Sequence, residues 1–520
     1  MNDPGVAAGP PSSDLPPPPD AATISDRSLC QRILRPTLPE LWTFLAIALP
    51  VVASLIATLP TVDLAYQLRA GADILAGRGI PTVDTWTFTA AGLPWLDQQW
   101  GAQAILAAIY GAASWSGLAI LRAALVGLTF GLILVAIRRR QPGLNARVLA
   151  WLTLAAFIVA SPALALRPQL LAMACFAVTL VLIAGRRKRP RAVWLVPLVA
   201  LAWANLHGSF VLAPALVLLA WLEDYGERSS RARTTFRTAL ATGAATLATP
   251  FGLEAWRYAA GLATNREVTA RITEWQPTTP TDIPGILFWA SVVLVAAAVL
   301  VIVRRTGTVP WPSIVTLVAF AALGAIAARG IAWWPAVAAV TMAGLLVPAG
   351  RPGPARPEPG TPRPEPRGSA LNALVGAALV VAGIAALPTW RAMDTGLDAP
   401  SGLLAHAPSG VTTVLRETAG PDDRVWNPQA WGSWLELAVP EPAYAFDSRI
   451  EVIPADAWSD GDVVAAAGPG WDAILDARGV TIVVAKGPPT TPLAAALAGS
   501  PAWRMAHADA DATIWLRADR

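Results

Sequence analysis

Acidic side chains with the capacity for chemistry gather immediately after the first long apolar segment of the chain. Asp63 follows the apolar residues 41–59 almost at once, and Tyr66 and Asp84 come after it. Carboxylates can exchange protons with a substrate or bind its hydroxyl groups. Ionisable groups at the edge of a membrane usually mark a substrate site or a pathway. We therefore take Asp63 and Asp84 as the leading candidates, with Asp73 and Asp97 as scaffold.

Later connections between apolar segments carry further polar motifs. They are Arg167-Pro168-Gln169, Asn205-Leu206-His207-Gly208, Glu274-Trp275-Gln276-Pro277 and Arg329-Gly330. Each has a plainer explanation. An arginine can anchor a helix end at the interface, His207 can satisfy backbone groups in a tight turn, and Asp63 and Asp84 can cap a helix or anchor a turn. It is the joint placement of these motifs that indicates a site.

The elements that must position these residues are membrane-spanning helices. The chain has 520 residues, of which 54% are hydrophobic and only 14% are charged, and its mean hydropathy is +0.49. Such a chain is too apolar to be a soluble protein, and its apolar residues fall into separate runs. About eleven spans are predicted, at residues 41–59, 117–137, 148–166, 170–184, 192–206, 210–222, 238–248, 286–303, 314–328, 331–346 and 370–387.

Clusters of arginine orient these spans. They precede the first span and follow the second, fourth, sixth, eighth and tenth, as in Arg138-Arg139-Arg140 and Arg304-Arg305. All of these connections fall on one side, which the positive-inside rule makes cytoplasmic. The N-terminus is then cytoplasmic, and the C-terminus and nearly all the polar motifs lie on the outer side.

The predicted fold is a polytopic α-helical membrane protein, with about eleven transmembrane helices and a small C-terminal α/β domain outside the cytoplasm. Residues 1–40 form a disordered cytoplasmic tail, because they are rich in Pro, Ser and Asp. Residues 41–349 form the transmembrane module, with a first outer loop at 60–116. Residues 350–369 form a Pro/Arg-rich cytoplasmic linker, residues 370–387 the last span, and residues 388–520 the outer domain.

Several kinds of site are not indicated by the sequence. The three histidines are widely spaced, and there is neither a His-Glu-x-x-His motif nor a pair of neighbouring cysteines, so no metal site is predicted. There is no phosphate-binding loop for ATP and no Gly-x-Ser-x-Gly elbow. No basic-aromatic motif points to nucleic acid as a partner.

Taken together, the motifs resemble a known family. Residues 63–71 and 79–88 are similar to the first loop of a group of uncharacterised bacterial proteins, and so are residues 167–169, 205–208, 274–277 and 447–449. Over residues 41–450 the chain resembles the GT-C superfamily of membrane glycosyltransferases. Those enzymes take a sugar from a polyprenyl-phosphate carrier and transfer it on the non-cytoplasmic face.

The resemblance implies a multi-pass enzyme of the bacterial plasma membrane. Its donor would be a polyprenyl-phosphate-linked sugar, and its acceptor a glycan, a lipid or a protein. Asp63 would be the catalytic base and Asp84 its partner, while Arg167 and Arg329 would bind the donor phosphate. Tyr66, Gln169, Asn205, His207, Glu274 and Trp275 would bind substrate, and Asp447 and Arg449 would hold the acceptor in the outer domain. No cofactor is implied with certainty, although Asp84 and His207 leave a divalent cation open.

One departure from the family keeps other functions open. Many members have two adjacent acids in the first loop, whereas Leu64 follows Asp63 here. The chain could instead transport or flip lipid-linked sugars, or serve as a non-catalytic scaffold for envelope assembly. A transporter should carry polar groups near the middle of the membrane, where Arg122 is the main charge. Asp447 and Arg449 could simply form a structural ion pair.

Overall fold

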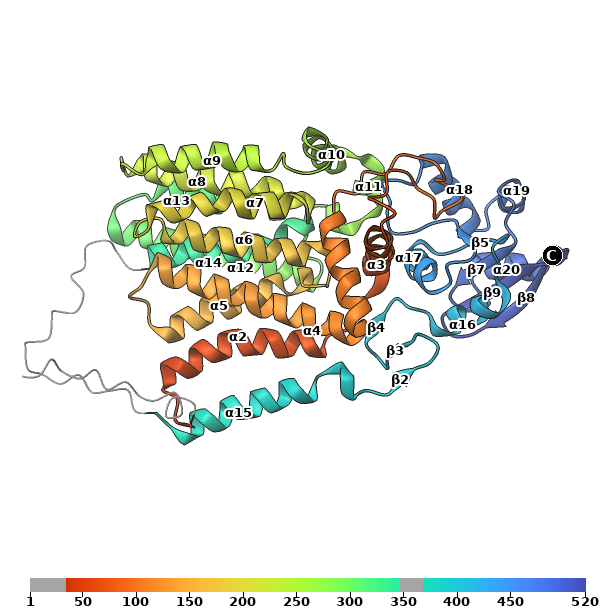
Figure 1. Cartoon of the computed structure of the whole chain (residues 1–520), viewed down its shortest axis with the longest axis horizontal. Helices are drawn as coiled ribbons and strands as arrows, with labels where there is room; N and C mark the ends of the chain where they lie inside the picture. Colours follow the sequence, from red (N-terminus) through yellow and green to blue (C-terminus); the bar gives the residue numbers. More distant parts are fainter. Residues whose placement is uncertain (1–33, 347–367) are drawn as a thin grey trace, which may run out of the picture.

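The computed structural model describes residues 34–346 and 368–520, and it has two parts (Figure 1). Long helices lie side by side in a bundle, and the strands and short helices of the C-terminal part gather at one end of it. The predictions for most of the N-terminal tail and of the Pro/Arg-rich linker lie outside the described residues.

Each predicted span coincides with a helix of the bundle. These helices are α2 (Leu38–Ile56), α4 (Trp100–Arg140), α5 (Ala146–Ala160), α6 (Pro168–Gly185), α7 (Val196–Ala204), α8 (Leu212–Gly226), α9 (Ala232–Ala245), α12 (Ile283–Thr306), α13 (Trp311–Ile326), α14 (Trp334–Leu345) and α15 (Ala370–Ala385). Within the described residues, six helices are long and apolar enough to cross a membrane, and four shorter apolar helices accompany them. The chain is thus a polytopic helical membrane protein, while the number of eleven crossings stays a prediction.

Local sequence explains where the first helices begin and bend. Thr37 caps α2, and its side chain and backbone exchange hydrogen bonds with Glu40 in a capping box. α4 begins at Trp100, within the segment that we expected to be loop, and it kinks at Ala113 and Ser114, where the backbone is not helical. The predicted outer loop thus contains two helical segments, the amphipathic helix α3 (Thr61–Leu75) and the part of α4 that precedes the kink.

The C-terminal part is built on a five-stranded mixed sheet, as expected for an α/β domain. The strands are β5 (Arg424–Trp426), β6 (Ala443–Tyr444), β7 (Ile482–Lys486), β8 (Trp503–Ala508) and β9 (Ala512–Arg517), in the order β6-β5-β7-β9-β8. β6, β5 and β7 are parallel, and β7, β9 and β8 are antiparallel. The accompanying helices are α16 (Ser409–Thr418), α17 (Gln429–Ala438), α18 (Ala455–Ala465), α19 (Trp471–Ala477) and α20 (Pro492–Gly499).

The two parts are joined through the backbone directly after α2. Strand β1 (Leu59–Pro60) pairs in parallel with β4 (Leu404–Ala405). The hydroxyl of Thr61 donates to the carbonyl oxygens of Ala405 and His406, each at 3.0 Å. Both contacts fix the first turn of α3, which is the turn that carries Asp63.

Candidate functional site

A cavity of about 260 Å³ opens beside the start of α3, where the bundle meets the C-terminal part. Its wall contains eight of the residues predicted from sequence: Asp63, Tyr66, Arg167, Gln169, His207, Glu274, Trp275 and Arg329. They come from separate connections of the bundle. The fold thus brings together most of the polar motifs that the sequence scatters over nearly 270 residues.

Arg167 joins two of the cavity's acids. Its Nε atom lies 3.1 Å from Oδ2 of Asp63, and its Nη1 atom donates to Oε1 of Glu274 at 2.7 Å. The carboxylate of Asp63 raises the pKa of Arg167, outweighing the effect of burial, and Glu274 adds to it. Pro168 at the start of α6 favours the extended backbone of Arg167 that aims its side chain at these partners. With one cation between two carboxylates, this group carries a net charge of about −1.

Arg329 is the arginine of this cavity whose charge is available to bind a ligand. Its guanidinium lies over the ring of Trp275, 4.5 Å from the ring centre. In the described part of the chain, no carboxylate lies within ion-pair distance of it. The backbone N–H of Ala328 donates to Gln276 O at 3.0 Å, which ties the Trp275 loop to the turn that carries Arg329. A fixed, unpaired guanidinium is well suited to bind a phosphate.

His207 is a neutral hydrogen-bonding group rather than a charged one. Burial, aided by the nearby charge of Arg329, lowers the pKa of His207 to about 3. Its Nδ1 atom accepts the backbone N–H of Ser209 at 3.1 Å. We infer that the proton of the neutral ring is on Nε2, which can then donate to a bound ligand. His207 is therefore suited to hold a hydroxyl or phosphate oxygen, not to exchange protons near pH 7.

Sequence reasoning missed two partners in the cavity wall, Tyr258 and Glu451. Tyr258 lies in α10 (Leu253–Thr264), and its hydroxyl donates to Oε1 of Glu451 at 3.0 Å. Burial raises the pKa of Glu451 and raises that of Tyr258 well above its usual value of 10. The only sequence signal was the position of Glu451, two residues after the motif Asp447-Ser448-Arg449.

Four predicted residues lie outside this cavity, and three of them form one buried cluster. Oδ1 of Asp84 accepts from Nη2 of Arg449 at 2.6 Å, and Oδ2 of Asp447 accepts from Nε of Arg449 at 2.6 Å. Asp84 is fully buried and also accepts the backbone N–H of Thr87 at 3.1 Å. These contacts fit the structural alternatives considered above, the turn anchor and the ion pair, and they separate Asp84 from its expected partner Asp63.

Asn205 is the fourth residue outside the cavity. Its side-chain oxygen accepts from Trp100 Nε1 at 3.1 Å, and its amide donates to Ala248 O at 3.0 Å. Its own carbonyl accepts the N–H of Gly101 at 3.1 Å. Asn205 thus joins the start of α4 to its own turn and to the connection that contains Ala248. It helps to hold His207, two residues later, in the cavity wall.

Comparisons with known proteins find similarity among solved structures. No family model matches the chain, and no curated protein matches it. Among solved structures, it is similar to the crystal structure of ArnT from Cupriavidus metallidurans in the apo state, with a TM-score of 0.47 and 15% sequence identity. The match covers 91% of this chain and 96% of that chain. A similarity this distant assigns no activity, so the function must be sought in the side chains of the cavity.

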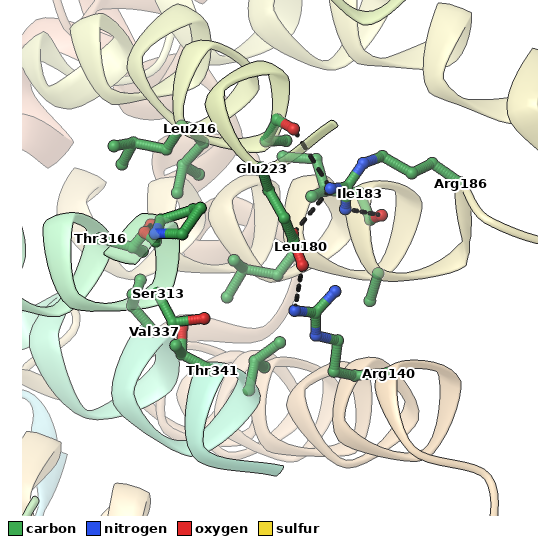
Figure 2. Close-up of a pocket in the computed structure, with 15 residues that line it drawn as sticks. Arg140, Leu180, Ile183, Arg186, Leu216, Glu223, Ser313, Thr316, Val337 and Thr341 are labelled. Atoms are coloured by element: carbon green, nitrogen blue, oxygen red, sulfur yellow. Dashed lines mark hydrogen bonds and ion pairs between the residues drawn. The ribbon is translucent and has the colours of Figure 1, made fainter. Parts of the chain in front are cut away.

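A second, smaller cavity of about 70 Å³ lies among α4, α6, α8, α13 and α14, and it is less suited to a substrate (Figure 2). Figure 2 shows Glu223 reaching between Arg140 and Arg186. Nη2 of Arg186 lies 2.7 Å from Oε2 of Glu223, and Nε lies 3.1 Å from Oδ2 of Asp224. The charges at this cavity are thus satisfied by one another.

The cavity beside α3 also lacks an evident metal-binding group. In residues 34–346 and 368–520, no set of three or more His, Cys, Asp or Glu side chains could hold a metal ion. The charged groups of the cavity wall are the Asp63–Arg167–Glu274 group, Arg329, Glu451 and Arg271, which pairs with Asp462.

Proposed function

We propose that this protein is a membrane glycosyltransferase that moves a sugar from a polyprenyl-phosphate donor to a hydroxyl of an envelope glycan, lipid or protein. The observation that carries the proposal is the convergence of Asp63, Arg167, His207 and Arg329 on one cavity at the end of the bundle. A sugar linked to a phosphate is already activated. The site therefore needs a carboxylate base and a cation for the leaving phosphate, and it has both.

In the proposed reaction, the acceptor hydroxyl oxygen attacks the anomeric carbon of the donor sugar. Its proton passes to the carboxylate of Asp63 as the new C–O bond forms. The bond from the anomeric carbon to the phosphate oxygen breaks, and polyprenyl phosphate leaves with the electron pair. The guanidinium of Arg329 stabilises the charge that develops on that phosphate. Attack from the face opposite the leaving group inverts the anomeric centre.

The remaining wall residues have supporting roles in this proposal. Arg167 holds Asp63 and Glu274 in place rather than binding the phosphate, because both acids already neutralise it. The neutral ring of His207 donates a hydrogen bond to a sugar or phosphate oxygen. Trp275, stacked with Arg329, offers an apolar face to the sugar ring. From the arginine clusters, we place the cavity on the outer side of a bacterial plasma membrane.

The proposal is tested with purified protein in lipid nanodiscs, supplied with labelled hexosyl and pentosyl polyprenyl phosphates and envelope acceptors. Asp63→Asn removes the base with little change in shape, so transfer should fall by roughly 10²- to 10⁴-fold. The control is Asp73→Asn on the same helix, where the acid pairs with Arg78 at the surface. If Asp63→Asn still transfers the sugar, Asp63 is not the base. If the wild type transfers no sugar from any donor, the proposed function is wrong.

A transporter of lipid-linked sugars is the alternative from another class. A transporter should carry polar groups near the middle of the membrane, and the main charge predicted there, Arg122, has a structural use. Its guanidinium donates to the carbonyl oxygens of Ser54, Ala57 and Thr58, which are left open where α2 ends. Vesicles that move labelled donor across the membrane without transferring its sugar would favour the transporter.

A further inference from the structure

The C-terminal part contributes one acid to the cavity, and this acid differs from the others in its surroundings. Glu451 lines the cavity beside Ser448 and Ile450. Asp63 and Glu274 share an arginine, whereas no lysine or arginine lies within ion-pair distance of Glu451 in the described residues. The cation whose charge acts on Glu451 is Arg449, which already bonds Asp84 and Asp447.

Burial shifts Glu451 towards its neutral form. Burial raises the pKa of Glu451, although a backbone hydrogen bond, the hydrogen bond from Tyr258 and the charge of Arg449 each act against it. Its direct partner is the Tyr258 hydroxyl, whose own pKa is raised by burial, so the phenol keeps its proton. A neutral carboxyl group and a phenol together offer both hydrogen-bond donors and acceptors. That is the combination that binds the hydroxyls of an uncharged sugar.

Tyr66 links this pair to the base. Its pKa is raised first by burial, then by the carboxylates of Asp63 and of Glu451. Tyr66 therefore lies within electrostatic reach of both acids, on the wall of the same cavity. An acceptor held by Glu451 and Tyr258 would have its neighbouring hydroxyls directed along the wall that carries Tyr66 and Asp63.

Glu451 is also held in a fixed position, as a recognition group must be. The backbone N–H of Val452 donates to Arg449 O at 2.9 Å. The guanidinium of Arg449 is fixed by Asp84, and it lies 4.4 Å from the ring centres of both Trp86 and Trp95. The first loop therefore shapes the cavity indirectly, by fixing the segment 447–452 that carries Glu451.

We propose that Glu451 and Tyr258 form the acceptor subsite of this cavity, and that it selects an uncharged, hydroxyl-rich acceptor, that is, a neutral glycan. This inference rests on the proposed function. The net negative charge of the Asp63–Arg167–Glu274 group would repel an acceptor that carries a carboxylate or a phosphate at this point. The donor phosphate is bound elsewhere on the wall, by Arg329. A subsite that hydrogen-bonds hydroxyls discriminates strongly against ligands that cannot make those bonds.

The test measures binding without donor, so it does not depend on transfer. Saturation-transfer NMR on the full chain in nanodiscs compares methyl glycosides of common hexoses with their uronic acid counterparts. We expect the wild type to bind the neutral glycosides at least tenfold more tightly. Glu451→Ala should weaken their binding by roughly tenfold, whereas Glu451→Gln, which resembles a neutral carboxyl, should stay within about threefold. The control is Glu441→Ala, at an exposed acid of the same domain.

Three results would overturn the proposal. They are equal binding of neutral and acidic glycosides by the wild type, no binding of neutral glycosides, and unchanged binding by Glu451→Ala. If Glu451→Ala does not fold, Tyr258→Phe carries the test, because it removes a single hydroxyl and should also weaken binding of the neutral glycosides. Failure of transfer with every donor would count against the proposed function alone, since these binding measurements need no reaction.

Discussion

Nη2 of Arg449 lies 2.6 Å from Oδ1 of Asp84, although 365 residues separate them in the chain. Both side chains are buried, and Asp447 completes the group. Two carboxylates therefore face one guanidinium away from water, and the guanidinium packs against both Trp86 and Trp95. This contact holds the first loop against the C-terminal part and fixes the segment that reaches the cavity.

Removing the Asp84 carboxylate should destabilise the protein. Truncating one partner of a buried ion pair typically costs about 3–5 kcal/mol, because the other charge is left buried. Asp84→Ala should therefore lower the unfolding midpoint in nanodiscs and reduce transfer together. Asp73→Ala breaks only an exposed pair with Arg78, which is worth about 0–1 kcal/mol. An Asp84→Ala protein as stable as Asp73→Ala would contradict the structural role given to Asp84.

Gly330→Ala should displace the arginine that we assign to the donor phosphate. A Cβ atom at Gly330 would lie 2.3 Å from the carbonyl oxygen of Leu323, which is backbone and cannot move aside easily. Such overpacking costs about 1–3 kcal/mol. The control is Gly243→Ala in α9, where a Cβ meets nothing within 4 Å, and where alanine should stabilise the helix by about 1 kcal/mol. Thermal melts and transfer rates measured on both variants check this pair of predictions.

Arg329→Gln should reduce turnover without unfolding the protein. It removes a cation that pairs with no carboxylate in the described residues, so little native stability depends on its charge. Loss of a group that stabilises developing charge typically lowers kcat by about 10²- to 10³-fold. Arg329→Lys should recover only part of this loss, because lysine lacks the planar group that stacks on Trp275. Full activity in Arg329→Gln would exclude it as the phosphate-binding residue.

Arg167 should behave differently, since it separates two acids. Arg167→Gln leaves Asp63 and Glu274 without their shared cation, so both stability and transfer should fall. Adding Glu274→Gln removes one of the two charges and should restore part of the stability. A double-mutant cycle on the unfolding midpoint measures this coupling, expected at about 0.5–3 kcal/mol. Strictly additive effects would mean that Arg167 and Glu274 do not act together.

Asp97 should make stability depend on pH. Burial raises the pKa of Asp97 from 3.8 to about 7, against a bond from Gln103 that lowers it. The folded protein binds the proton of the Asp97 carboxyl more tightly than the unfolded chain does. The stability that this proton contributes is therefore fully present below about pH 4. It is lost as the pH rises through 7. Asp97→Asn removes this dependence, so its stability relative to the wild type should rise by up to about 4 kcal/mol between pH 4 and 8. Melting curves at both pH values check the sign.

The sequence predicted the helices well because they depend on long apolar runs. Each predicted span coincides with a helix, since a run of apolar residues has few other ways to satisfy its backbone in lipid. The helical residues 100–112 were not predicted as part of a span, because Gln99 provides no side-chain cap and the backbone leaves the helical conformation at Ala113 and Ser114. Strands β7 and β9 contain β-branched residues, which favour strand structure, whereas the two- and three-residue strands left no readable pattern.

The cavity could be predicted only in part, for a different reason. Placing the connections on one side of the membrane brought Asp63, Arg167 and Glu274 to the same end of the bundle. It could not show that Arg167 is shared by two acids, which depends on distances of a few ångströms. Nor could it separate Asp84, which is buried, from Asp63, which is not, because both look alike in the sequence. Glu451 and Tyr258 meet only through the packing of the C-terminal part.

The pairing of β1 with β4 has a consequence for how the protein is made. Thr61, which begins the helix that carries Asp63, bonds to His406, 345 residues later. At about 5–20 residues per second, the ribosome needs roughly 20 to 70 seconds to cover that interval. The first helices enter the membrane long before then, while α3 still lacks its partner strand. The cavity is therefore assembled last, and a chain released early would carry most of its helices but no finished site.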